Sequence, residues 1–220
     1  MVVAHRGIHG TGVTENTMDA FQAALRAGAA MIELDVRRSG AGELAILHDH
    51  ELNGVTLSSC SLAEFTQRTG HRPPQLGEVL DWADGRIALD VELKEDGYVG
   101  ELAPPLREFA AAGNTLIVTS FLDPVLAALH ELAPELTLGL LLAWSAERFV
   151  ERARDCGAGI VLPEMKLLDE PLVSAAHEAG LQVLAWDFFA TEHAGWLADA
   201  RLTGVITDDV PGALRAVTAG

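Results

Sequence analysis

Short apolar runs alternate with amphipathic stretches along the whole chain. Each run is bounded by polar or glycine-containing segments and is too short for a helix, so the pattern predicts buried strands. Strands are expected at 2–5, 31–36, 87–93, 115–119, 136–142, 159–162, 181–186 and 204–207.

Between these runs, apolar residues recur at spacings of three and four, which predicts helices. Helices are expected at 15–28, 76–84, 98–112, 122–132, 146–156, 170–180, 192–200 and 211–218. Thr14 and Asp123 lie near helix starts, where N-caps are found. Glycines fall where helices should end: Gly28, Gly113, Gly157 and Gly180.

Strict alternation of strand and helix predicts a parallel sheet. Eight such units in 220 residues favour a closed (β/α)8 barrel, a TIM barrel, formed by one domain over residues 1–220. An open doubly wound sheet is the alternative, but the first turn, HRGIHGTG at 5–12, lacks the G-x-G-x-x-G spacing. Residues 44–75 are long for a connection, and we expect a short excursion near the active-site mouth.

Composition narrows the classes of partner. Hydrophobic residues make up 49% of the chain, which suffices for a large core, and the net charge is −17 with 15 basic residues. Nucleic acid and anionic membrane surfaces are disfavoured, because both need a basic footprint. An anionic small molecule is compatible with this charge if a cation and a few basic groups are focused in one site. The oligomeric state stays open.

Cysteine usage and hydropathy bear on location. Cys60 and Cys156 lack metal-site spacing, so we expect free thiols in a reducing, cytoplasmic compartment. No signal peptide is visible before the first strand. The longest uncharged apolar run, 136–146, is too short to span a bilayer, so no stable membrane insertion is expected.

Acidic residues interrupt two of the predicted core strands. Glu33 and Asp35 are two residues apart and share one strand face, and Asp90, Glu92 and Lys94 alternate in the same way. In a barrel these faces point inward at neighbouring strand ends, where catalytic groups lie.

Three carboxylates on that rim repel one another unless something pairs with them. Oxygens of Glu33, Asp35 and Glu92 suit one hard divalent cation, Mg²⁺ or Ca²⁺. Zinc would be favoured only if histidines joined the set. The alternative is a ring of ion pairs with basic neighbours: Arg6, Arg37 and Lys94.

Basic residues near the rim are candidates for binding phosphate. Lys94 ends a core strand in a chain that has two lysines, and an inward lysine binds phosphate as a point charge. Its alternative role is pairing with Glu92 or Asp90. Arg6 follows a strand on a glycine turn and could grip phosphate oxygens; its alternative is a surface position.

Two histidines lie at strand ends beside the acidic residues. His5 and His48 are therefore predicted to be the general acid and base, because imidazole transfers protons near neutral pH. His9 and His50 are close enough in sequence to be weaker candidates.

Several motifs together resemble the glycerophosphodiester phosphodiesterase family. They are HRG at 5–7, EN at 15–16, AFQAALRAGAAMIELDV at 20–36, HD at 48–49 and VELK at 91–94. SF at 120–121, AWD at 185–187 and GVITDDVP at 204–211 agree with it. The resemblance covers nearly the whole chain, and the combination is more specific than any single motif.

The resemblance implies a (β/α)8 barrel and metal-dependent hydrolysis of glycerophosphodiesters to glycerol 3-phosphate and an alcohol. It implies that the glycerol 2-hydroxyl attacks phosphorus, that His48 protonates the leaving alcohol, and that water opens the cyclic product. By position, the metal ligands would be Glu33, Asp35 and Glu92, the acid–base pair His5 and His48, and the phosphate ligands Arg6 and Lys94.

Some positions depart from the family pattern and bear on the choice of substrate. Thr14 replaces the proline common before EN, and Gly54 lies where an arginine is common. Ser39 and Ala41 replace a threonine and an aspartate, and Trp186 leads into Asp187-Phe188-Phe189 rather than a threonine-containing motif. The excursion is short for the family, which suggests loose selection of the alcohol.

Trp186 is a further predicted substrate-binding residue, and Phe121, Glu15 and Asn16 have weaker predicted roles. Trp186 could form an apolar wall for glycerol or its alcohol, and Phe121 could assist it, with core packing as the alternative. Glu15 and Asn16 open a predicted helix and could support the site, with helix capping as the alternative.

Three other functions are alternatives to the phosphodiesterase. A metal-dependent sugar isomerase or aldolase could use the same barrel. A non-catalytic phosphoester-binding barrel would lack a histidine or a metal carboxylate. A lysophospholipase D-type activity would need an apolar rim, which Leu52, Val55 and Leu57 suggest weakly.

Overall fold

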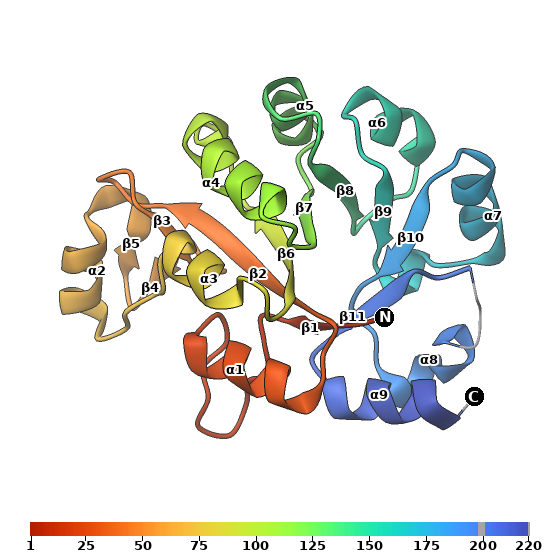
Figure 1. Ribbon diagram of the computed structural model, residues 1–220, viewed down its shortest axis with the longest axis horizontal. Coiled ribbons are helices and arrows are strands. Elements are labelled where there is room, and N and C mark those ends of the chain that lie inside the picture. Colours follow the sequence, from red (N-terminus) through yellow and green to blue (C-terminus); the bar gives the residue numbers. More distant parts are fainter. Residues whose placement is uncertain (198–200, 220) are drawn as a thin grey trace.

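Eight parallel strands close into a barrel in the computed structural model, which describes residues 1–197 and 201–219 (Figure 1). Closure is explicit, because β1 pairs with β2 on one side and with β11 on the other, through Ala4↔Ile32 and Val3↔Ile206. The barrel strands are β1 (Val2–His5), β2 (Met31–Arg38), β6 (Ala88–Leu93), β7 (Leu116–Ser120), β8 (Thr137–Leu142), β9 (Ile160–Pro163), β10 (Gln182–Ala185) and β11 (Gly204–Thr207). The predicted barrel is confirmed, and the open sheet is excluded.

Helices surround the strands (Figure 1), and most begin and end within two residues of their predicted bounds. They are α1 (Met18–Ala27), α3 (Leu76–Ala83), α4 (Val99–Ala111), α5 (Asp123–Leu132), α6 (Phe149–Asp155), α7 (Glu170–Glu178), α8 (Ala190–Leu197) and α9 (Val210–Ala219). Residues 198–200 of the helix predicted at 192–200 lie outside the described residues.

Thr14 and Asp123 lie near helix starts as predicted, but neither is the N-cap: Thr14 precedes the cap of α1 by three residues, and Asp123 follows the cap of α5 by one. Thr17, rather than Thr14, caps α1, because its hydroxyl accepts a hydrogen bond from the Ala20 amide. Asp123 is the first residue of α5, and its carboxylate binds Arg152.

Of the glycines predicted at helix ends, Gly28 is the left-handed C-cap of α1 with φ 88°. Gly113, Gly157 and Gly180 each follow the C-cap residue of their helix by one position and are also left-handed.

Alternation along β2 sends its side chains to two different environments. Ile32, Leu34 and Val36 join the large core between strands and helices. Met31 joins a smaller apolar cluster inside the barrel, where Gly139 leaves room for its neighbours: a Cβ there would lie 2.5 Å from Leu162 Cδ1. An apolar cluster that fills the barrel interior is typical of TIM barrels. The polar residues nearer the carboxyl end of β2 are therefore left at the mouth of the barrel.

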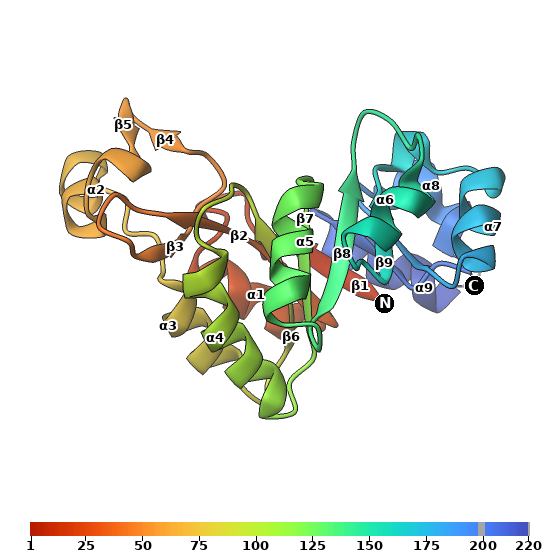
Figure 2. The ribbon, with the colours of Figure 1, turned by 90° about the horizontal axis from the view of Figure 1, so that it is seen from above.

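The excursion between β2 and α3 contains more structure than predicted. It has β3 (Leu44–Ile46), antiparallel to β2, and then β4 (Glu51–Leu52), β5 (Val55–Thr56), the 3-10 helix η1 (Leu57–Ser59) and the helix α2 (Leu62–Thr69). Figure 2 shows this segment extending from one side of the barrel. It packs around a small apolar cluster of its own, which includes Leu57 and Phe65.

The helix α2 lies where none is predicted, although the sequence carries its start signal. Ser61 and Glu64 form a capping box, in which each side chain bonds the other residue's backbone amide. Gly70 ends the helix in the left-handed conformation. A start signal at Ser61 and a stop signal at Gly70, with the eight helix residues between them, therefore identify this helix in retrospect.

The cysteines and the hydropathy of the helices can be examined in the structure. Cys60 and Cys156 are both free and buried. Among the described residues, no helix has the length and apolar character needed to cross a bilayer.

Candidate active site

A cavity of about 240 Å³ opens at the carboxyl ends of the barrel strands. Its walls differ in character. The polar wall is formed by His5, Arg6, Glu33, His48, Asp90, Glu92, Lys94 and Thr119. The apolar wall is formed by Phe121, Leu141, Ala143, Trp144, Trp186 and Ile206. Most of the predicted site residues therefore converge on one cavity.

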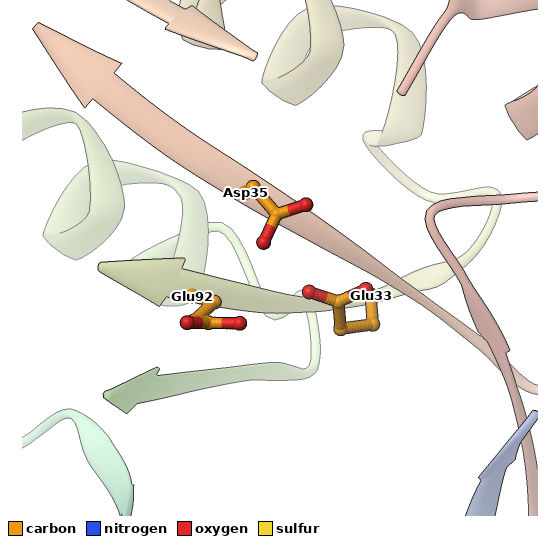
Figure 3. A group of neighbouring side chains, drawn as sticks. All are labelled: Glu33, Asp35 and Glu92. Atoms are coloured by element: carbon orange, nitrogen blue, oxygen red, sulfur yellow. The ribbon is translucent and has the colours of Figure 1, made fainter. Parts of the chain in front are cut away.

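Three carboxylates meet at the polar wall: Glu33 and Glu92 line the cavity, and Asp35 is fully buried beside them. Glu33 and Asp35 come from β2 and Glu92 from the neighbouring β6, and Figure 3 shows them directed toward a common space. One oxygen from each lies within 4.8 Å of the others, and all three residues are buried. This is a set of hard oxygen ligands at a spacing that one divalent cation can bridge.

Two cations neutralise part of this charge. Lys94 Nζ lies 2.7 Å from Glu92 Oε1 and 3.2 Å from Asp35 Oδ1. Arg6 Nε lies 3.2 Å from Asp35 Oδ2. Arg37 does not join the predicted ion-pair ring, because it binds Glu95 instead.

The ion pairs leave part of the carboxylate cluster unmatched. Among the described residues, Glu33 Oε1 and Asp90 Oδ2 are buried and have no hydrogen-bonding or ionic partner. Buried charged oxygens without partners are costly. The residues present therefore fit a bound cation better than a closed ring of ion pairs.

The pKa values reflect this crowding. Burial, reinforced by Asp35 and Glu92, raises the pKa of Glu33 well above its usual range. Burial is also the main cause that raises the pKa of Glu92 and of Asp90 to about 7. Burial opposes ionisation of Asp35 too, but Lys94 and Arg6 outweigh it and lower the pKa of Asp35.

The metal-free protein is therefore expected to lose stability as the pH rises from about 4 to about 7. Within that window the folded state holds protons on Asp90 and Glu92 that the unfolded state has released. Unfolding midpoints measured with chelator should fall across this range. An unfolding midpoint that rises with pH in this range would contradict the raised pKa values of Asp90 and Glu92. Asp90→Asn should make the midpoint depend less steeply on pH.

His5 is held from outside the cavity. Its Nδ1 lies 2.7 Å from Asp208 Oδ1, just beyond the end of β11, and its Nε2 lies 3.9 Å from Glu33 Oε2. The hydrogen bond from His5 lowers the pKa of Asp208, so this carboxylate is ionised and accepts. Because Nδ1 then carries the proton, the Nε2 lone pair faces the cavity. His9 Nε2 lies 3.3 Å from the same Asp208 oxygen.

His48 follows β3 and lines the same cavity as His5. Its Nδ1 bonds Asp49 Oδ1 at 2.8 Å, and its backbone carbonyl accepts a 2.6 Å hydrogen bond from Arg37 Nε. Burial lowers the pKa of His48 despite the opposing influence of Asp35. An anionic phosphodiester beside the ring would favour the protonated form. His50 is exposed and does not line the cavity.

The weaker candidates Glu15 and Asn16 both contact the site. Asn16 is buried and donates a 2.7 Å hydrogen bond to Asp35 Oδ2, from a left-handed backbone with φ 54°. Glu15 accepts a 3.0 Å hydrogen bond from Arg6 Nη1. Neither residue belongs to α1, so helix capping does not explain them.

The apolar wall is an aromatic group. Phe121 contacts Trp186 edge to face, with ring centroids 5.7 Å apart, and Trp144 with centroids 6.0 Å apart. Trp186 donates its indole N–H to the Leu162 carbonyl. Trp144 is 85% exposed, so its ring stands at the cavity mouth rather than in the core.

Comparison with known proteins agrees with the site. Residues 5–211 match the profile of the Glycerophosphoryl diester phosphodiesterase family. A glycerophosphodiester phosphodiesterase of Caldanaerobacter subterraneus subsp. tengcongensis is 27% identical, over 95% of this chain and 94% of its own length.

Solved structures share the fold. The glycerophosphodiester phosphodiesterase of Thermotoga maritima is 26% identical, with a TM-score of 0.78 over 97% of this chain and 96% of its own. An Oleispira antarctica phosphodiesterase, solved with the product sn-glycerol-3-phosphate, has a TM-score of 0.83 and 24% identity, over 100% of this chain and 96% of its own.

Fold, site and relatives together define a class, the phosphoric diester hydrolases built on a (β/α)8 barrel. Within that class, the chain belongs to the Glycerophosphoryl diester phosphodiesterase family, whose profile spans almost its full length. The resemblance carried by the HRG, ELDV, HD and ELK motifs is thereby confirmed.

Proposed function

We propose that this protein hydrolyses glycerophosphodiesters to glycerol 3-phosphate and an alcohol, with Glu33, Asp35 and Glu92 holding one divalent cation. The observation that carries the proposal is a cluster of three buried carboxylates, two of which line one cavity together with two imidazoles and two cationic side chains. When bound, the cation supplies positive charge that stabilises the charge growing on the phosphoryl oxygens.

His5 is the proposed base. With Nδ1–H held by Asp208, its Nε2 can take the proton of the glycerol 2-hydroxyl while that oxygen attacks phosphorus. The new bond displaces the alcohol and forms a cyclic phosphate, which water then opens to glycerol 3-phosphate. Lys94 and Arg6 border the cavity and can bind non-bridging phosphate oxygens.

His48 is the proposed acid. Its Nδ1 is bonded to Asp49, so Nε2 is the nitrogen available to give a proton to the departing alcohol oxygen. The phosphodiester's own negative charge beside the ring supports protonation. The aromatic wall of Phe121 and Trp186 lies opposite and suits the carbon backbone of glycerol.

The direct test is release of glycerol 3-phosphate from glycerophosphocholine and glycerophosphoethanolamine. Release is expected with Mg²⁺ or Ca²⁺ and should be lost with chelator, then restored when the cation is returned. Comparing the two cations chooses between them. Release of glycerol 3-phosphate that persists in chelator would refute a required cation in the carboxylate cluster. No release with either substrate and either cation would refute the proposed activity.

Asp208 is proposed to position His5. Asp208→Asn should lower kcat about 10²-fold or more, because an amide can hold the ring in the wrong tautomer, while KM changes little. Steady-state kinetics separate the two constants. If KM changed as much as kcat, or if the unfolding midpoint fell while kcat stayed the same, Asp208 would have a structural role instead. Asp209→Asn next to it is the control, since Asp209 bonds the Gly212 amide rather than a histidine.

A lysophospholipase D-type activity is a second candidate favoured by one observation. Trp144, Leu122 and Phe189 are exposed at the ends of β8, β7 and β10, which gives part of the mouth an apolar rim. Hydrolysis of lysophosphatidylcholine to choline in the assay above would support it. An isomerase is disfavoured by family membership, and a mere binding barrel is disfavoured by an intact set of histidines and carboxylates.

A further inference from the structure

A second cavity, of about 320 Å³, lies against the first. It is bounded by the turn before α1 and by the excursion, and it is lined by Thr14, Glu15, Asn16, Leu47, His48, Asp49, Leu52, Asn53, Thr69, Gly70 and His71. His48 lines both cavities. The imidazole proposed to act on the leaving oxygen is therefore part of the wall between them.

The position of His48 fixes which part of a substrate this second cavity can receive. The leaving oxygen must lie within hydrogen-bonding reach of the His48 ring. The phosphate and glycerol are accounted for in the first cavity by Arg6, Lys94 and the aromatic wall. The remainder of the alcohol extends from the leaving oxygen, past the ring, into the second cavity.

The two cavities differ in charge. Arg6 and Lys94 line the first, whereas among the described residues no lysine or arginine lines the second. Glu15 and Asp49 are its carboxylates: Glu15 is paired with Arg6, whereas Asp49, which bonds His48 Nδ1, has a side chain that is 72% exposed. Burial lowers the pKa of His71, so this side chain adds no positive charge near neutral pH. Leu47 and Leu52 add apolar surface.

We infer that the second cavity is a subsite for the leaving alcohol and that it selects a small amino alcohol carrying a positive charge. A compact ammonium group gains from the exposed carboxylate of Asp49, and its carbon atoms gain from Leu47 and Leu52. The same carboxylate repels an anionic alcohol, which is therefore disfavoured. This inference rests on the proposed function, and it replaces loose selection of the alcohol with selection by charge.

The excursion gains a role from this assignment. Residues after β3, together with Thr69, Gly70 and His71 at the end of α2, form one side of the subsite. The other side is the turn that carries Glu15 and Asn16. A short excursion is therefore sufficient to enclose an alcohol of a few carbon atoms.

The test compares two diesters that differ in one charge. Glycerophosphocholine and its neutral isostere, the glycerophosphodiester of 3,3-dimethylbutanol, have nearly the same shape. The wild-type protein should favour the choline ester by about tenfold in kcat/KM at low salt. His71→Lys, which adds a positive charge to the subsite, should reduce that ratio at least about fivefold. The isostere serves as the internal control for folding.

Two control variants locate the effect. His177→Lys adds the same charge on the exposed face of α7 and should leave the ratio unchanged. Trp144→Ala removes the exposed aromatic ring from the apolar wall of the first cavity and should also leave the ratio of the two kcat/KM values unchanged.

The possible outcomes are distinct. A wild-type ratio near one, or a ratio that falls in Trp144→Ala and not in His71→Lys, overturns the subsite while the phosphodiesterase activity stands. Failure to hydrolyse either diester overturns the proposed function, and the subsite falls with it.

Discussion

Replacing His48 with alanine is expected to lower kcat for glycerophosphocholine by about 10²–10⁴-fold, the usual worth of a general acid. The choline alkoxide is a poor leaving group and needs a proton as the P–O bond breaks. A p-nitrophenyl ester of glycerol phosphate has a good leaving group, so His48→Ala should cost much less with it. The difference between these two losses assigns the proton transfer to the leaving oxygen.

The His48 experiment has a matched control in the same chain. His177→Ala, on the exposed face of α7, removes the same ring far from the cavity and should leave both substrates unaffected. Equal losses of His48→Ala with both esters would contradict an acid at the leaving group and would favour a role in binding phosphate.

Replacing Glu33 with glutamine is expected to lower activity and raise stability in the metal-free protein. Activity should fall about 10²-fold or more at any concentration of cation, because one of three charged ligands is lost. Without a cation, the unfolding midpoint should rise, because Glu33 Oε1 is a buried oxygen without a partner among the described residues.

Thermal unfolding with and without Mg²⁺ or Ca²⁺ checks both parts. The wild-type midpoint should rise on adding the cation, by mass action on the folded state, and the Glu33→Gln midpoint should not. Glu178→Gln, at the exposed end of α7, is the control for loss of a charge alone. A destabilised Glu33→Gln protein that still responds to the cation would refute Glu33 as a ligand.

The alternation of side chains along the strands predicted the carboxylate part of the site, whose residues lie at nearby positions on two strands. Glu33 and Asp35 are two residues apart, so the strand period alone put them on one face, and the register of β2 against β6 sets Asp35 opposite Glu92. The strand and helix pattern likewise predicted the barrel, since each element carries its own periodicity.

Contacts between distant segments were beyond the sequence pattern. Asp208 is 203 positions from His5, and their hydrogen bond exists only because β11 pairs with β1. The exposed Trp144 gave no periodic signal. The second cavity depends on how the excursion folds over the turn at 14–16, and its helix α2 was missed although its capping box is local.

Closure of the barrel by its first and last strands bears on how the protein is made. A growing chain that has emerged only through β6 already carries all three carboxylates, on paired strands. His5 has no Asp208 to hold it until the last strand arrives beside the first. Full turnover would therefore begin only after β11 has been made and has paired with β1, so catalytic activity would report closure of the barrel during folding.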